Sequence, residues 1–392
     1  IAESARTVSF LPLAHVFERL AGHFLMFASG ATVAYAESPD TLREDFGLVS
    51  PTVGTSVPRV YEKIYAAIRE EAAGSSLTER IFEWATSVAR ACATSERPGL
   101  GLRARRRIAD RLVFSTVREA LGGEIEFLIS GGGSLSPDLC RLYHGMGLPI
   151  LEGYGLTETS PVISANRPEE PEIGTMGPPV MGVETRLDTS TVPVESDEGS
   201  AVGELLVRGP NVTSGYWNAP DATAEAFTSD GWFRTGDIVE ETDAGYLLFR
   251  ERAKQLLVLS TGKNVAPGPI EDAFATTDLV EQCMVVGDGR KFVGALLVPD
   301  VEAVRAWAHE RGIDLPDSAE AIVDDERVHD RIAEVVNGVN EAFERHERIK
   351  RFRLVPEAFT VENDLLTPTM KKKRRNITER YADRIEALYA GA

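Results

Sequence analysis

Residues 126–158 read EFLISGGGSLSPDLCRLYHGMGLPILEGYGLTE, and this stretch decides the fold. Glu126 to Ile129 predict a short apolar strand, Ser130 to Gly133 a loop, and Ser136-Pro137 an N-cap with proline in the first helical turn. Pro149 to Leu151 predict a second strand, which leads into the polar, glycine-containing segment 152–158, EGYGLTE. Two successive strands that end in such loops are typical of a parallel α/β sheet with a ligand at the carboxyl ends of its strands.

The regions on either side of this unit differ in character. Residues 60–122 predict helices, because apolar residues such as Tyr61, Ile64, Tyr65 and Ile68 recur at helical spacing. Residues 172–250 contain short β segments separated by glycine turns, which predicts a β-rich subdomain. The remainder predicts a compact α+β module with strands at 283–286 and 292–298 and helices near 301–312 and 329–345.

We therefore expect two domains that meet between Arg250 and Lys254. Residues 1–250 form an α/β, parallel-sheet domain with a β-rich subdomain over about residues 172–250, and residues 251–392 form a small, mobile α+β C-terminal domain. A length of 392 residues suits two or three domains. Val8 to Pro12 already look like an apolar strand inside a domain, so we expect the sequence to begin within a longer protein.

Composition excludes several functional classes. The formal net charge of −19 argues against a nucleic-acid-binding protein, because phosphate backbones favour a basic surface. The three cysteines lie far apart without metal-ligand spacing, so we expect neither disulfides nor a zinc site, and a cytoplasmic location fits best. No run of about 18 apolar residues predicts a membrane span.

Three segments combine small residues with single polar groups, as nucleotide sites do. Gly131 to Gly133 would let the backbone lie flat against an adenine ring, although an ordinary flexible turn is an equal alternative. Tyr154 to Glu158 offer an aromatic face, a hydroxyl and a carboxylate that suit a base, a phosphate oxygen and Mg²⁺. The alternative there is a helix N-cap by Thr157, with Glu158 near the positive end of the helix. Asp237 could accept hydrogen bonds from ribose hydroxyls, or it could be a surface turn aspartate.

Taken in this order, the three segments resemble the adenylate-forming superfamily of acyl-CoA synthetases, adenylation domains and luciferases. Two further segments agree, residues 215–227 and residues 250–271. Within the superfamily the chain is most similar to bacterial long-chain fatty-acid–CoA ligases. The segments that carry this likeness are residues 9–19, 57–63 and 365–371 and the long helical region between Lys63 and Gly122.

The resemblance implies a role for each matching residue. Gly131, Gly132, Gly133 and Tyr154, with Gly155 in the same motif, would hold adenine; Thr157 would hold the α-phosphate, Glu158 the Mg²⁺, and Asp237 and Arg252 the ribose. Lys254 would be the hinge, Gly262 would face the pantetheine arm of CoA, Lys371 would approach the reacting carboxylate and α-phosphate, and His15 would lie beside the acyl pocket.

Some of these residues have simpler interpretations. Lys371 opens a run of five cations that ends at Arg375, and such a run is often a solvated or anion-attracting tail. His15 could be an ordinary core histidine. The cluster Arg103, Arg105, Arg106 and Arg107 could touch anionic lipid headgroups at the inner face of the membrane, but a solvated helix face is the favoured interpretation.

The function implied by the resemblance is AMP-forming acid–thiol ligation. ATP, a long-chain fatty acid and CoA would yield acyl-CoA, AMP and pyrophosphate through an acyl-adenylate, with Mg²⁺ as cofactor. The Ser/Thr/Gly-rich loop that closes on the outer phosphates in this family lies upstream of the segment 9–19, and the sequence contains no such loop. Two alternatives therefore stay open: a fatty-acyl-AMP ligase that loads a carrier protein, and a non-catalytic remnant that acts as a binding protein.

Overall fold

The chain forms two compact units in a computed structural model, which describes residues 1–392 except 39–40, 96, 191–200, 369 and 391–392. The first unit comprises Ile1–Thr235 and Val239–Phe249, and the second comprises Gly236–Ile238 and Arg250–Ala392. Among the described residues, no helix is both long enough and apolar enough to cross a membrane.

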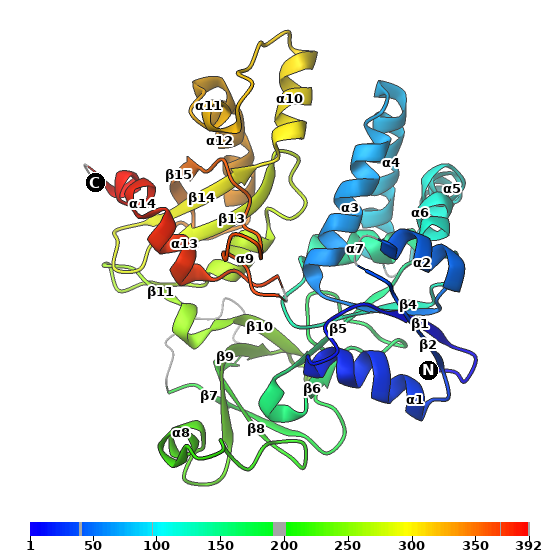
Figure 1. Ribbon diagram of the computed structural model, residues 1–392, viewed down its shortest axis with the longest axis vertical. Helices are drawn as coiled ribbons and strands as arrows, with labels where there is room; N and C mark the ends of the chain where they lie inside the picture. The colour runs from blue at the N-terminus through cyan, green and yellow to red at the C-terminus, as the bar shows by residue number, and fades with distance from the viewer. Residues whose placement is uncertain (39–40, 96, 191–200, 369, 391–392) are drawn as a thin grey trace. The chain divides into compact units, whose positions relative to one another are not determined.

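The main sheet of the first unit has the strand order β3-β4-β5-β6 (Figure 1). The strands are β3 Val53–Ser56, β4 Phe127–Ser130, β5 Ile150–Gly155 and β6 Val162–Ala165. The first three are parallel, which confirms the expected sheet, and β6 runs antiparallel to β5. The loop expected directly after Leu151 is wrong, because β5 continues to Gly155 through its pairing with β6. A separate parallel pair joins β1 Arg6–Ser9 to β2 Thr32–Tyr35.

Helices cover this sheet, and those expected over residues 60–122 are confirmed. In chain order, the helices up to residue 146 are η1 Glu18–Phe24, α1 Leu25–Ala28, α2 Leu42–Val49, α3 Pro58–Ala72, α4 Ser76–Ala93, α5 Leu100–Ala109, η3 Asp110–Phe114, α6 Ser115–Ala120 and α7 Pro137–Met146. Two buried tyrosines tie the helices to the sheet: Tyr143 donates a hydrogen bond to the Tyr61 carbonyl, and Tyr61 donates one to the Ile129 carbonyl, both at 2.8 Å. Ser136 occupies the N-cap position of α7 as expected, but its side chain makes no capping hydrogen bond.

The expected β-rich subdomain is also confirmed. Its sheet has the order β10-β9-β8-β7, formed by β7 Glu184–Asp188, β8 Ala201–Arg208, β9 Phe233–Glu241 and β10 Leu247–Arg252. Buried Leu205, Val207, Phe233 and Leu247 form its core together with Ile163 of β6. Two short helices, η4 Thr157–Thr159 and α8 Pro220–Ala226, lie in connections between strands. A helix near Thr157 was expected only as an alternative, and α8 was not expected.

The second unit is built on the sheet β13-β14-β15, flanked by helices on both faces. Its elements are η5 Ala253–Gln255, β11 Leu257–Val258, β12 Asn264–Val265, α9 Pro267–Asp272, β13 Val280–Val286, β14 Val293–Pro299, α10 Val301–Glu310, α11 Ala319–Val323, α12 Glu326–Asn340, β15 Ile349–Leu354, α13 Arg374–Arg380 and α14 Ala382–Tyr389. Successive residues of β14 point to opposite faces, so Leu297 packs in one core and Leu296 in the other. Strand β14 is therefore apolar along its whole length, which made it readable from the sequence.

Candidate functional site

Two serine hydroxyls and a glutamate carboxylate lie side by side at the carboxyl ends of the parallel strands in the first unit. Ser56 at the end of β3 is the register partner of Ser130 at the end of β4, and Ser130 pairs in turn with Glu152 of β5. Both serines are buried, and within the described part of the chain neither Oγ atom has a hydrogen-bond partner. A buried polar group without a partner costs on the order of 1–3 kcal/mol. This edge of the sheet therefore has unused capacity to bind a polar ligand.

The glycines that follow β4 differ in what their positions require. Gly132 has a φ of +81°, in the left-handed region that favours glycine. A Cβ on Gly131 would lie 2.7 Å from the ring of Phe17, so a larger residue there would require that ring to move. Gly133 has ordinary space around it. The conformation and packing of the loop therefore favour glycine at positions 131 and 132, but they do not require it at position 133.

Gly155, at the end of β5, has a packing requirement of its own. A Cβ there would lie 1.6 Å from the carbonyl oxygen of Pro161, where β6 crosses close to β5. The side chain of Tyr154 is half-buried against the core of the β-rich subdomain. Close packing against Pro161 therefore explains Gly155 in the motif 154–158, whether or not a ligand binds there.

The short helix η4 positions Thr157 and Glu158. Its first turn is capped by Thr159, whose Oγ1 accepts a hydrogen bond from the Leu156 N–H at 3.0 Å, so the alternative that Thr157 is the N-cap is wrong. Thr157 is exposed, and its side chain makes no hydrogen bond within the described ranges. Glu158 accepts a hydrogen bond at 3.0 Å from the hydroxyl of Tyr216. Burial, together with the Glu158 carboxylate, raises the pKa of that hydroxyl.

Tyr216 had been noted only as part of a similar segment, and its contact to Glu158 could not be read from the sequence. No cluster of three or more metal-ligating side chains occurs among the described residues. Glu158 alone could therefore hold Mg²⁺ only together with phosphate oxygens of a bound nucleotide, which is the usual way proteins bind this ion.

Asp237 and Arg252 form an ion pair in the second unit. Their Oδ1 and Nε atoms lie 2.8 Å apart, and Asp237 is fully buried in β9. The alternative of a surface turn aspartate is therefore wrong. Lys371 is electrostatically coupled to this pair: loss of hydration lowers the pKa of its ammonium, the guanidinium of Arg252 lowers it further, and the carboxylate of Asp237 acts in the opposite direction. Three residues assigned to one nucleotide thus interact within a single unit.

The run of cations from Lys371 to Arg375 is a set of separately paired residues. Lys372 and Arg374 bind the two oxygens of Glu271 at 2.6 and 2.8 Å, Lys373 pairs with Asp364, and Arg375 pairs with Glu379. The interpretation of this run as a solvated tail is therefore wrong for its central residues. The ammonium of Lys371 forms no ion pair or hydrogen bond with any residue that the structure describes. It is the one cation of the run that remains available to an anionic substrate.

Two buried carboxylates, Glu271 and Glu251, had no role in the sequence analysis, and Glu271 binds two cations of the segment that carries Lys371. Glu271 of α9 also accepts a hydrogen bond from the Val285 N–H at 2.8 Å. Burial alone would raise the pKa of Glu271, but the charges of Lys372 and Arg374 lower it. Glu251 accepts hydrogen bonds from the N–H groups of Arg252 and Gly268, both at 2.8 Å, and burial raises its pKa.

The remaining assigned residues have simple environments. Lys254 is exposed in η5, and Gly262 has a φ of +79° in the turn between β11 and β12, with open space around it. His15 is half-buried before η1, and its Nδ1 accepts a hydrogen bond from the Phe17 N–H at 3.3 Å. The first unit therefore contains His15, Gly131, Gly132, Gly133, Tyr154, Gly155, Thr157 and Glu158, and the second contains Asp237, Arg252, Lys254, Gly262 and Lys371.

Comparisons with known proteins identify the family of the chain. Residues 1–217 match the family model described as AMP-binding enzyme, and residues 254–392 match the model described as AMP-binding enzyme C-terminal domain. The chain is 40% identical to the long-chain-fatty-acid–CoA ligase FadD15 of Mycobacterium bovis, over 99% of this chain and 63% of that protein. It is 32% identical to the human long-chain-fatty-acid–CoA ligase 1, over 98% of this chain and 54% of that protein.

A solved structure extends the likeness to the fold. It is the A domain of carboxylic acid reductase from Segniliparus rugosus, in complex with AMP and a co-purified carboxylic acid. The TM-score is 0.74 and the identity 28%, over 98% of this chain and 54% of that one. The chain thus spans less than two thirds of the length of these relatives.

Proposed function

The chain belongs to the family of AMP-binding enzymes, and we propose that it is the adenylate-handling and acyl-transferring part of a long-chain fatty-acid–CoA ligase. The observation that carries the proposal is the coupling of Lys371, Asp237 and Arg252 in the second unit. Lys371 is the residue of its run whose side chain forms no ion pair with a described carboxylate. Such a group is suited to an anion that arrives with the substrate.

In the proposed first step, a carboxylate oxygen of the fatty acid attacks the α-phosphorus of ATP. A P–O bond forms to the acyl group, the bond to the β-phosphate oxygen breaks, and pyrophosphate leaves with the electron pair. The chain's residues position the reactants and stabilise charge, which are the dominant contributions in phosphoryl-transfer chemistry. Lys371 would stabilise the negative charge at the α-phosphate, and Asp237 would accept hydrogen bonds from the ribose hydroxyls. Mg²⁺ held by Glu158 and phosphate oxygens would supply further positive charge.

In the proposed second step, the CoA thiolate attacks the acyl carbonyl carbon, and AMP leaves as the C–O bond to phosphate breaks. Gly262 suits an approach by the pantetheine arm, because the turn that carries it is open and has no side chain at that point. Lys254 suits a hinge, because it lies exposed in a single 3₁₀ turn of the second unit, a few residues after the first unit ends at Phe249. A rotation there would exchange Lys371 for the Gly262 turn between the two half-reactions.

The test uses the second half-reaction, which needs no contact with the outer phosphates of ATP. The 392-residue chain is mixed with palmitoyl-AMP, and AMP release is measured with and without CoA. We expect CoA-dependent release of AMP and formation of palmitoyl-CoA. Release stimulated by a phosphopantetheinylated carrier protein but not by CoA would overturn the CoA ligase assignment in favour of carrier loading. If calorimetry detects no affinity for AMP or palmitoyl-AMP, the chain is a non-catalytic remnant.

A further inference from the structure

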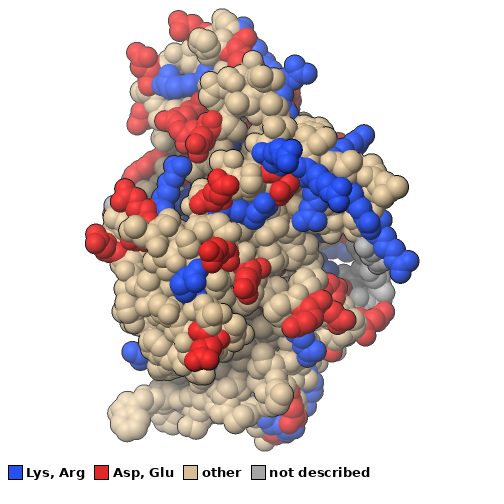
Figure 2. All heavy atoms as spheres, turned by 90° about the vertical axis from the view of Figure 1, so that its right-hand side faces the viewer, with Lys and Arg blue, Asp and Glu red and all other residues tan. Residues whose placement is uncertain are grey.

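One surface of the first unit is strongly basic in a chain whose net charge is −19. Residues 97–111, in and around α5, contain six arginines and a single acidic residue, Asp110. We call the exposed face of α5 and the start of η3 the α5 surface; it consists of Leu100, Arg103, Ala104, Arg105, Arg106, Arg107, Ile108, Arg111 and Leu112. Figure 2 views the side on which α5 lies in Figure 1, and it shows a band of Lys and Arg side chains there.

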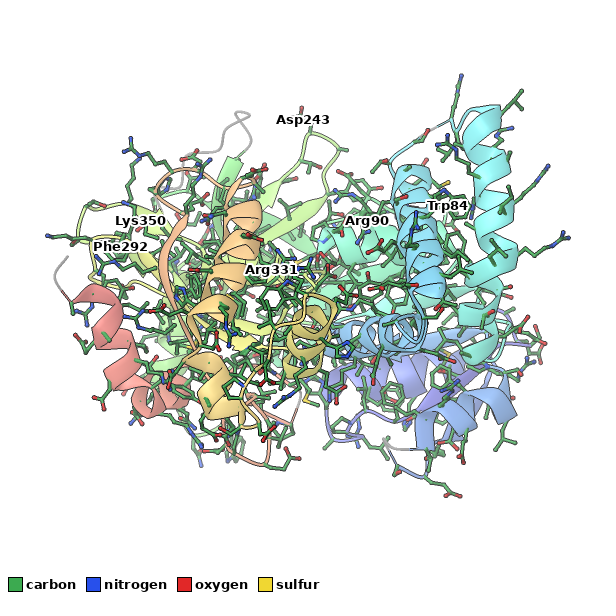
Figure 3. All side chains as sticks on the ribbon, turned by 90° about the horizontal axis from the view of Figure 1, so that it is seen from above. Trp84, Arg90, Asp243, Phe292, Arg331 and Lys350 are labelled. Carbon is green, nitrogen blue, oxygen red and sulfur yellow. The ribbon has the colours of Figure 1, made fainter. Side chains whose placement is uncertain are left out.

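The arginines of the α5 surface are not compensated by carboxylates. None of the five forms an ion pair or a side-chain hydrogen bond with the residues that the structure describes. The one neighbouring acid is already engaged, because Asp110 pairs with Arg118 at 2.8 Å. The positive charge is therefore available to an external anion. In Figure 3, α5 stands at the edge of the ribbon, with nitrogen-tipped side chains directed away from the molecule.

The same surface exposes large apolar side chains. Leu100 is 85% exposed, Ile108 54% and Leu112 53%. Leu100, Ala104, Ile108 and Leu112 are spaced four residues apart, as are Arg103, Arg107 and Arg111, so each set forms a stripe along the helix. The opposite side of the helix packs on the protein core through Leu102 and buried Ala109. The α5 surface therefore combines an apolar stripe with uncompensated positive charge, and this pairing of properties is the one that an interfacial helix has.

A hollow lies among the side chains of this surface. It has a volume of about 940 Å³, and its lining is mostly arginine and aliphatic side chains together with Cys92, Pro98 and Asp110. Burial raises the pKa of the Cys92 thiol, and the nearby charge of Arg106 acts to lower it. Guanidinium groups bind phosphate through paired, parallel hydrogen bonds, so this hollow suits a phosphate-bearing headgroup.

We propose that the α5 surface binds a bilayer that contains anionic phospholipids. The arginines contact headgroup phosphates, and Leu100, Ile108 and Leu112 enter the interfacial layer, as in amphipathic helices that lie on membranes. The exposed Leu100, Ile108 and Leu112 favour a lipid surface over a nucleic acid, because the interfacial layer of a bilayer takes up apolar side chains whereas a phosphate backbone offers them no partner. The biological reason rests on the proposed function, because long-chain fatty acids partition into bilayers.

The experiment measures co-sedimentation of the 392-residue chain with vesicles, in the absence of any substrate. One set of vesicles is pure phosphatidylcholine, and the other contains about 30% phosphatidylglycerol. We expect binding to the anionic vesicles only, weakened by salt. The variant Arg103→Gln/Arg107→Gln/Arg111→Gln should bind roughly 100-fold more weakly, since each basic residue near an anionic membrane contributes about a fivefold factor.

Two further variants separate the contributions. Arg80, Arg345 and Lys350 are exposed elsewhere on the chain, so Arg80→Gln/Arg345→Gln/Lys350→Gln changes the net charge equally and should alter binding by less than about twofold. Leu100→Ser/Ile108→Ser/Leu112→Ser keeps every charge and should weaken binding roughly tenfold by removing the apolar contribution. Circular dichroism with thermal melting confirms that each variant is folded.

Three outcomes would overturn the proposal. The first is equal binding of the chain to both vesicle types. The second is a loss of binding in the control variant as large as that in the Arg103→Gln/Arg107→Gln/Arg111→Gln variant. The third is an unchanged affinity of the serine variant for the vesicles together with displacement of the chain from the vesicles by RNA. This measurement is independent of the ligase chemistry. Vesicle binding without CoA-dependent AMP release would contradict only the proposed function, and AMP release without vesicle binding would contradict only the α5 surface.

Discussion

The substitution Glu271→Gln tests whether a buried carboxylate anchors the segment that carries Lys371. The glutamine keeps the size of the side chain and can still accept the hydrogen bond from the Val285 N–H. It removes the negative charge shared by Lys372 and Arg374, whose side chains are only 28% and 21% exposed. Breaking a buried ion pair from one side costs about 3–5 kcal/mol, and the partial hydration of both cations favours the lower end, about 3 kcal/mol.

Hydrogen exchange measured by mass spectrometry tests this magnitude in each unit separately. Peptides from β13 and β14 should lose about 3 kcal/mol of protection, whereas peptides from β4 and β5 in the first unit should not change. The matched control is Glu379→Gln, which removes an exposed charge paired with Arg375 and should cost less than about 0.5 kcal/mol. A loss below about 1 kcal/mol, or one equal to that of the control, would refute the anchoring role of Glu271.

The pH dependence provides a second check on the same residue. The folded state lowers the pKa of Glu271 from its ordinary value of 4.5, so the charged carboxylate stabilises the fold above pH 4.5. That contribution is lost as the pH falls through the lowered value in the folded state. The difference in stability between the wild type and Glu271→Gln should therefore be constant near neutral pH and shrink below pH 4.5. A difference that grows on acidification would mean that the carboxylate is protonated in the fold.

Three further predictions concern the site and its supports. In a preparation that carries out pyrophosphate exchange, Lys371→Ala should reduce acyl-AMP formation by about 10²-fold or more while sparing thioester formation from supplied acyl-AMP; surviving exchange would mean that another lysine is responsible. Lys254→Pro should slow thioester formation more than adenylation, as half-reaction rates would show, and equal losses would count against a hinge at this residue. Gly155→Ala should lower the unfolding free energy by about 3 kcal/mol or more, because its Cβ would overlap the Pro161 carbonyl oxygen, whereas Gly133→Ala should change it by less than about 1 kcal/mol. Thermal unfolding of the two alanine variants compares them directly, and similar losses would refute the packing argument.

The sequence could predict elements whose signals are local. The apolar run before Ser130, the proline at the start of α7 and the helical periodicity after residue 60 each lie within a few residues of the element they specify. Strand β15 was missed because its six residues, IKRFRL, include three cations and gain their stability from parallel pairing with β14, more than 50 positions earlier. The extension of β5 to Gly155 was missed for the same reason, since only its pairing with β6 shows that these residues are a strand.

The sequence by itself determined which residue types stand in which motif, and therefore the family to which the chain belongs. The tertiary structure decided which of those residues are buried, paired or available. Asp237 could equally have been a surface turn residue, and Lys371 could not be distinguished from the four cations that follow it. The physical reason is that burial and ion pairing depend on partners far away along the chain: Glu271, which engages Lys372, lies 101 residues before it. Only the folded chain brings such partners together.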